Sequence, residues 1–264
     1  MQGEARGLID YLTERWWFYF LLLMIFLTTP PFSSAGYSWF QLKDVILSAL
    51  SNAVIYSLSD LFWPSLIIHV TIALILAMII FNRQLAVKLF NWHAFILYSM
   101  IAIGQSVAFI EKYGLVILVG NLILTSITAI LWGWETLSVK RNTFEKANLS
   151  LSTIWLIPLA FFAFWDPQCS SIDPCLLIRY LIAGYYGTAY CITTPLILTV
   201  MIIFYPSVNK SVMRYTAFPG LLFATISVLA PKLSLAPFWS GIIHTPLLLT
   251  SLYALLLSWR DVKS

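Results

Sequence analysis

The chain has 264 residues, of which 60% are hydrophobic and only 10% are charged, whereas a soluble domain carries about 25% charged residues. So few polar groups cannot cover a surface in water, which excludes a soluble globular domain and predicts an integral protein of the cell membrane. The formal net charge of +4 is typical of basic cytoplasmic loops. We therefore expect the lipid bilayer as a partner and no nucleic acid.

Apolar runs of roughly 17 to 25 residues are long enough to cross a bilayer. The first fifteen residues mix acidic and basic side chains, so they are expected to form a cytoplasmic segment rather than a signal peptide. The predicted spans are about 16–35, 62–81, 93–110, 114–134, 149–165, 177–205, 215–231 and 238–258. The sequence predicts an all-α polytopic transmembrane helix bundle of about eight spans, with residues 1–264 as a single integral membrane domain. Seven spans remain the alternative, with the last two paired as a re-entrant unit.

The segment "QLKDVILSALSNAVIYSLSD" follows the first span and differs in pattern from the spans. Leu47, Leu50, Val54 and Leu58 recur at helical spacing, and polar residues follow the same spacing on another face. This pattern predicts an amphipathic helix lying in the outer interface. A helix packed on the rim of the bundle fits the same pattern.

The distribution of lysine and arginine predicts the orientation of the spans. With the N-terminus inside, the outer segments carry four of the fifteen cations, Lys43, Lys112, Arg179 and Lys232, and the inner segments carry the rest. Cytoplasmic loops hold an excess of positive charge. Most tryptophans also fall near the proposed span ends, where indole rings favour the headgroup region. Both termini are therefore predicted to be cytoplasmic.

Cys169 and Cys175 fall in the predicted outer loop between the fifth and sixth spans. An extracytoplasmic loop permits disulfides, and the short intervening segment can bring the two residues within bonding range. We predict a disulfide between them. Free thiols and a metal site are the alternatives.

Polar residues from several spans share one depth, counted at 1.5 Å per residue from each outer end. His69, Gln105, Asn121 and His244 lie roughly 8–10 Å deep, and the polar run of the sixth span reaches roughly 12–16 Å. The predicted binding residues are His69, Gln105, Asn121, Tyr185, Tyr186, Thr188 and His244. Such groups are costly in hydrocarbon unless they are paired or hydrated. They predict a polar network or an outward-facing cavity, and interhelical hydrogen bonding is the simpler alternative.

His69 and His244 have nearly equal predicted depths, which raises the hypothesis of a shared haem or copper site. No cofactor is specified by any other pattern. His93 is expected at the cytoplasmic start of the third span and Glu135 at an inner boundary, where neither residue needs a special role. No catalytic set emerges, so an enzyme is not favoured.

Three functions compete at this point. The first is a multi-pass membrane protein with a binding or transport role at an outward-facing polar site in the outer third of the bilayer. The second is a cofactor- or metal-handling membrane subunit that uses His69 and His244. The third is a non-catalytic structural or assembly subunit of a larger membrane complex, with other membrane subunits as partners. The first is preferred because of the shared depth of the polar residues.

Overall fold

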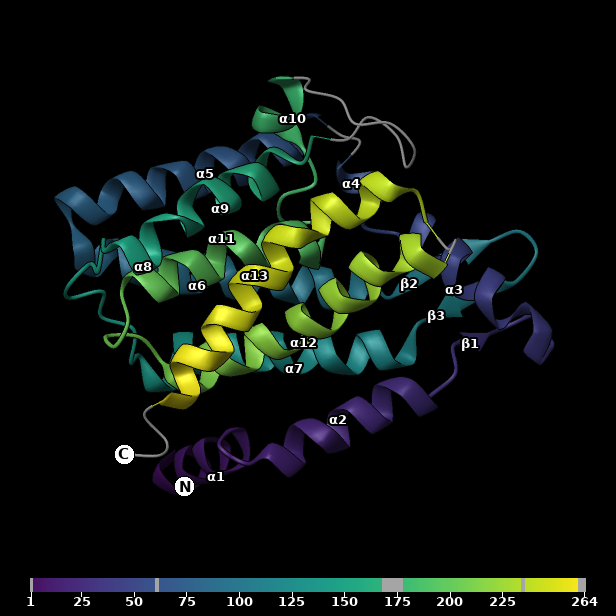
Figure 1. Cartoon of the computed structure of the whole chain (residues 1–264), viewed down its shortest axis with the longest axis horizontal. Coiled ribbons are helices and arrows are strands. Elements are labelled where there is room, and N and C mark those ends of the chain that lie inside the picture. Colours follow the sequence, from purple (N-terminus) through teal and green to yellow (C-terminus); the bar gives the residue numbers. More distant parts are fainter. Residues whose placement is uncertain (1, 60–61, 168–177, 234–235, 261–264) are drawn as a thin grey trace.

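Figure 1 shows the computed structural model of the chain, which describes residues 2–59, 62–167, 178–233 and 236–260. Helices make up most of it, with three short strands. The α-helices are α1 (Gln2–Thr13), α2 (Trp16–Thr28), α3 (Leu42–Ser51), α4 (Tyr56–Ser59), α5 (Phe62–Phe81), α6 (Arg83–Gly104), α7 (Val119–Trp134), α8 (Leu151–Ile154), α9 (Leu156–Trp165), α10 (Ile178–Ala183), α11 (Tyr190–Ile203), α12 (Lys210–Leu229) and α13 (Phe238–Arg260). The other elements are β1 (Phe32–Ser33), β2 (Val107–Ile110), β3 (Gly114–Ile117), the 3-10 turns Trp39–Gln41 and Ala230–Leu233, and the π-helical turn Glu135–Val139.

Within the described residues, five helices are long and apolar enough to cross a membrane: α5, α6, α12, α13, and α7 with its π-helical turn. The helix α2, the pair α8–α9 and the helix α11 are shorter but equally apolar. The length and composition of these helices indicate an integral membrane protein. The expectation of an all-α membrane architecture is confirmed.

The two ends of the bundle carry different structures (Figure 1). The strands β1, β2 and β3 and the helix α3 cover one end, and α1, α8 and the last turn of α13 lie at the other. The predicted orientation places the first of these ends outside. We call them the sheet end and the α1 end.

Large aromatic side chains fill the core between α6, α7, α11 and α12. Trp132 is completely buried, and its indole N–H donates to the hydroxyl of Thr216 at 3.1 Å. The hydroxyl of Tyr190 donates to the carbonyl of the same Thr216 at 2.7 Å. Tyr98 shares a hydrogen bond of 3.1 Å with Thr194. Each buried ring thus contributes apolar area while its polar atom finds a partner.

The third predicted span, 93–110, has the wrong bounds, because α6 runs from Arg83 to Gly104. Asn82 caps its first turn, and the Asn82 side chain accepts a hydrogen bond from the backbone N–H of Leu85 at 3.1 Å. The apolar residues after Gly104 form the hairpin of β2 and β3 instead of helix. Gly114 begins β3 with φ of +66°, a conformation that favours glycine. The third and fourth predicted spans are therefore separated by a β-hairpin.

The hairpin joins β1 in an antiparallel sheet of order β1-β3-β2, with Phe32 paired to Ile117. Helix α3 packs on this sheet through Val45 and Ala49, which are buried with residues of β2 and β3. Its leucines are the exposed face, with Leu47 40% exposed. The helix ends at Ser51, so Val54 and Leu58 of the predicted stripe lie beyond it. The packing of α3 on the sheet agrees with the second interpretation, and its placement in the outer interface stays a prediction.

The N-terminal segment is a helix docked at the α1 end of the bundle. Asp10 forms a bidentate ion pair with Arg141, at 3.0 and 2.6 Å, and accepts a hydrogen bond from the hydroxyl of Ser211. Arg214, which is 1% exposed, donates to the carbonyl oxygens of Thr13 at 2.9 Å and Ser258 at 2.6 Å. A buried guanidinium thus ties α1, α12 and α13 together, although Arg214 is expected in an inner loop.

Glu135 is fully buried, contrary to the expectation of an ordinary boundary residue. One carboxyl oxygen accepts the backbone N–H of Asn142 and the other accepts the side-chain amide of Asn209, both at 2.7 Å. Asn142 in turn donates to Asn91 and accepts the backbone N–H of Asn209. The oxygen of the Asn209 side chain caps α12 by accepting the backbone N–H of Ser211. This set of four residues, Glu135, Asn91, Asn142 and Asn209, is called the Glu135 network below.

Candidate functional site

The sixth predicted span is interrupted, because α10 ends at Ala183 and α11 begins at Tyr190. The first peptide of the interruption, at Gly184, is held by two side chains of α5. Ser65 donates its hydroxyl to the Gly184 carbonyl at 2.6 Å, and the Nε2 atom of His69 accepts the Gly184 N–H at 3.3 Å. Ser65 and His69 lie four residues apart on one face of the helix. These two side chains therefore take the place of the backbone hydrogen-bond partners that a continuous helix would have given Gly184.

The ring of His69 has a defined tautomer because both nitrogens have partners. Its Nδ1 atom lies 2.8 Å from the carbonyl oxygen of Ser65 and must donate to it. The Nε2 atom, which accepts the Gly184 N–H, carries no proton. His69 is 3% exposed, so this is a buried, neutral and fully paired imidazole.

Two further backbone N–H groups at the interruption donate to side chains, while those of Thr188 and Ala189 donate to the Tyr185 carbonyl. The N–H of Gly187 donates to the hydroxyl of Thr193 at 2.8 Å, and the N–H of Tyr190 donates to the side-chain oxygen of Gln105 at 3.1 Å. Gly187 has φ of +87°, and a Cβ atom there would lie 2.6 Å from a side-chain carbon of Ile68 on α5. Glycine is therefore required where the interrupted chain crosses α5. Non-helical backbone at membrane depth is tolerated where it is buried in protein or lines a cavity.

Tyr186 occupies the centre of the interruption and is completely buried. Its ring contacts His69 edge-on at 5.5 Å, His93 in a stacked geometry at 6.0 Å, and Phe164 at 5.0 Å between centroids. Its hydroxyl lies 3.2 Å from the Nε2 atom of His93. The structure thus brings together one tyrosine and two histidines from α5, α6 and the interruption. Together with Phe164 of α9, they form what we call the Tyr186 cluster.

His93 is the member of the Tyr186 cluster that sequence reasoning missed. It was expected at an interface, but α6 begins ten residues earlier, at Arg83, which places His93 about 15 Å along the helix. It is 8% exposed. The signal that could have found it is Asn82, a good N-cap residue ahead of an amphipathic stretch.

The other predicted binding residues lie towards the sheet end of the same region. Asn121 donates to the hydroxyl of Ser106 at 2.9 Å, next to Gln105 at the end of α6. The hydroxyl of Thr188 donates to the carbonyl of Tyr185 at 2.9 Å. The phenol ring of Tyr185 stands outside the Tyr186 cluster, against the ring of Tyr56 at 5.7 Å. Tyr185, Tyr186 and Thr188 therefore lie within the interruption. His69 and Gln105 accept backbone N–H groups from its two ends, and Asn121 borders it.

His244 lies on α13 and not in the Tyr186 cluster. Its Nδ1 atom donates to the carbonyl of Ser240 at 2.7 Å. Helix α9 contacts the two helices that carry His69 and His244. Phe164 of α9 packs on His69 of α5, and Phe162 packs on Trp239 of α13. Among the described residues no group of three or more His, Cys, Asp or Glu side chains could hold a metal ion. The two-histidine site remains a prediction.

Cys169 and Cys175 lie outside the described residues, so the predicted disulfide remains a prediction. Cys191 is a free cysteine on α11 and packs against the core.

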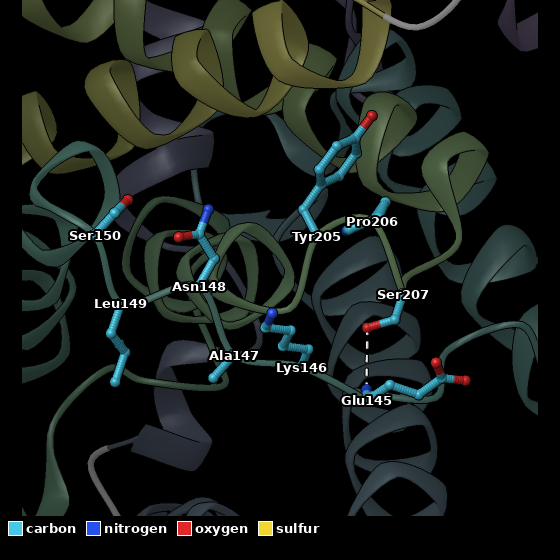
Figure 2. A pocket seen from close by; sticks show the side chains of 9 residues that line it. All are labelled: Glu145, Lys146, Ala147, Asn148, Leu149, Ser150, Tyr205, Pro206 and Ser207. Carbon is cyan, nitrogen blue, oxygen red and sulfur yellow. Dashed lines mark hydrogen bonds between the residues drawn. The ribbon is translucent and has the colours of Figure 1, made fainter.

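One hollow lies away from this site, in the loops that precede α8 and α12 (Figure 2). It has a volume of about 490 Å³ and is lined by Glu145, Lys146, Ala147, Asn148, Leu149, Ser150, Tyr205, Pro206 and Ser207. The hydroxyl of Ser207 accepts the backbone N–H of Glu145 at 3.1 Å, which joins the two loops. Residues 145–149 are exposed, so this hollow is a surface depression between loops and not a buried site.

The interruption of α10–α11 and the Tyr186 cluster therefore form the candidate functional site. Comparison with known proteins gives no match for this chain: no family model fits it, and no curated protein and no solved structure is significantly similar to it.

Proposed function

We propose that the chain crosses the cell membrane eight times, with both termini in the cytoplasm, and binds or transports a ligand at the interruption of α10–α11. The eight passes are the five long helices together with α2, α8–α9 and α10–α11. Lipid surrounds these passes, and other membrane subunits are the further partners we propose. The outer orientation of the sheet end follows from the excess of lysine and arginine on the opposite side.

The observation that carries the proposal is the replacement of helical hydrogen bonds by side chains at the interruption. Ser65, His69, Gln105 and Thr193 hold backbone groups of Gly184, Gly187 and Tyr190. Interrupted helices form substrate sites in many membrane carriers, because the freed backbone groups can exchange partners with a ligand. Packing alone requires no such interruption.

The depth of the interruption agrees with a site near the outer surface. Gly184 follows the six residues of α10, which is about 9 Å of helix from its start. Tyr185, Tyr186 and Thr188 follow at once. A ligand entering from outside would meet Thr188 and Gln105 before it met the Tyr186 cluster. Asn121 would border its path.

The test is the accessibility of Thr188 from outside the cell. Thr188 is 1% exposed, so a cysteine at this position reacts only when the site opens. The variant Thr188→Cys is made in a background without the native cysteines and treated in intact cells with a membrane-impermeant methanethiosulfonate. We expect measurable labelling, slower than for Lys112→Cys on the exposed hairpin.

The matched control is Thr250→Cys on α13, because Thr250 is equally buried and forms only hydrogen bonds within its own helix. It should stay unlabelled. Labelling of Thr188→Cys no faster than that of Thr250→Cys would mean that the site does not open to the outside, and the proposal would be wrong.

A further inference from the structure

A second hollow opens sideways between α5 and α6, on the other side of His93 from Tyr186. Its volume is about 320 Å³, at the lower end of the range for small-molecule pockets. It is lined by Thr71, Leu74, Ile75, Met78, Leu89, Trp92, His93 and Ile96. The rim residues Leu74 and Ile96 are 59% and 50% exposed. In a bilayer this mouth faces the hydrocarbon chains rather than water.

His93 is the buried side chain of this pocket that has a free bonding position. Thr71 already donates its hydroxyl to the carbonyl of Ile67 at 2.7 Å. His93 uses its Nε2 atom for Tyr186, and its Nδ1 atom has no hydrogen-bond partner among the described residues. An imidazole nitrogen without a partner is costly in an apolar environment. A ligand oxygen at the floor of the pocket would satisfy it.

The depth of His93 in the bilayer limits the kinds of ligand that can reach it. His93 lies about 15 Å from the start of α6, which is the middle of a hydrocarbon core about 30 Å thick. A phospholipid keeps its charged headgroup at the surface, because charge at the centre of the bilayer is strongly unfavourable. Only a molecule that dissolves in the hydrocarbon layer, with a small uncharged polar end, can bring an oxygen to this depth.

We propose that the pocket binds a neutral lipid of the quinone class, with a carbonyl oxygen accepting a hydrogen bond from the Nδ1–H of His93. The hydroxyl of Tyr186 then donates to Nε2, so the ligand and the Tyr186 cluster share one chain of hydrogen bonds. Leu74, Ile75 and Ile96 contact the ring, and the tail continues into the surrounding lipid. This inference goes beyond the proposed function, because the pocket opens between α5 and α6 and shares only His93 with the Tyr186 cluster.

The probe is a decyl-benzoquinone with a photoactivatable diazirine in its tail, added to vesicles that contain the full-length protein. Mass spectrometry maps the crosslinked residues. We expect labelling on α5 and α6 that excess unlabelled decyl-benzoquinone displaces. The variant His93→Phe keeps an aromatic ring but has no ring nitrogen, so labelling should fall about tenfold, the value of one hydrogen bond near 1.4 kcal/mol. Tyr253→Phe on α13, which removes a polar atom outside the pocket lining, is the control and should label as the native protein does.

A second variant, which leaves His93 in place, tests the pocket in case His93→Phe does not fold. Leu74→Trp fills the pocket from an exposed rim position, where a larger side chain is tolerated, and should abolish labelling. A diazirine hydrocarbon without oxygen and a diazirine phosphatidylcholine should label weakly and equally in native protein and His93→Phe. The inference would be overturned if all three probes labelled the native protein equally. It would also be overturned if the quinone probe labelled His93→Phe and Leu74→Trp as strongly as the native protein. Either result would show only that lipid contacts an apolar groove.

The same preparations separate this inference from the proposed function. Outward labelling of Thr188→Cys without displaceable quinone labelling would refute the lipid pocket alone. Displaceable quinone labelling with an inaccessible Thr188→Cys would support the pocket and refute the outward-facing site.

Discussion

Replacing Glu135 with alanine should destabilise the protein strongly, because it leaves two buried donors without acceptors. The backbone N–H of Asn142 and the side-chain amide of Asn209 both donate to this carboxyl group at 2.7 Å. A buried donor without a partner costs about 1–3 kcal/mol. The expected loss in the free energy of unfolding is therefore about 2–6 kcal/mol, or roughly 10 °C in Tm for a chain of this size.

The variant Glu135→Gln should lie between alanine and the native residue. Its remaining oxygen can accept the N–H of Asn142, but its NH₂ group then faces the NH₂ group of Asn209. Asn209 cannot reverse its amide without losing the cap of α12, since its oxygen already accepts the N–H groups of Ser211 and Val212. One unsatisfied donor predicts a loss of about 1–3 kcal/mol.

The assay is unfolding of the detergent-solubilised protein in increasing SDS, followed by tryptophan fluorescence. Glu111→Ala is the matched control, because Glu111 is an exposed glutamate on the hairpin, and its replacement should change stability by less than about 0.5 kcal/mol. A Glu135→Ala variant as stable as the control, or a Glu135→Gln variant less stable than Glu135→Ala, would refute this account of the Glu135 network.

Three further predictions follow from other parts of the molecule. Arg214→Ala should lower the free energy of unfolding by about 1–3 kcal/mol, because the Ser258 carbonyl loses this donor while the Thr13 carbonyl keeps only the Tyr19 hydroxyl; a loss below about 0.5 kcal/mol in the same SDS titration would contradict this. In a cysteine-free background, Lys112→Cys should react with impermeant thiol reagents in intact cells and Lys140→Cys should not, and the reverse pattern would invert the topology. Mass spectrometry of unreduced protein should recover a peptide that links Cys169 to Cys175, whereas two free thiols would rule out the disulfide.

Composition and hydropathy predict well those helices that run without interruption through the bundle. The expected span 62–81 coincides with α5, and 238–258 agrees closely with α13. Such helices are apolar along their whole length, so a hydropathy window finds both their existence and their ends. The membrane class follows for the same reason.

Hydropathy predicts the wrong helix bounds where an apolar run continues beyond the end of a helix. Residues 107–110 and 114–117 are as apolar as their neighbours but pair as strands, and an apolar run of this length carries no periodic signal that separates strand from helix. The error moved the predicted start of α6 by ten residues and placed His93 at a surface. The interruption after Ala183 was hidden by the same continuous hydropathy.

The candidate site depends on contacts that depth alone does not specify. Counting residues from the span ends places His69 and His244 at the same depth in the bilayer. Equal depth does not determine which helices are neighbours. The hydroxyl of Ser65 meets the Gly184 carbonyl across 119 residues of chain. Only the packing of α5, α6 and α9 determines that His69 and His93 both contact Tyr186.

The sheet that covers one end of the bundle has a consequence for biosynthesis. Ser33 donates a hydrogen bond to the carbonyl of Tyr113, 80 residues later in the chain, and β1 pairs with β3 but not with β2. When the first helix enters the bilayer, the strand that completes β1 has therefore not been synthesised. Residues 32–33 and the face of α3 that carries Val45 and Ala49 must therefore stay unpaired while α5 and α6 are inserted.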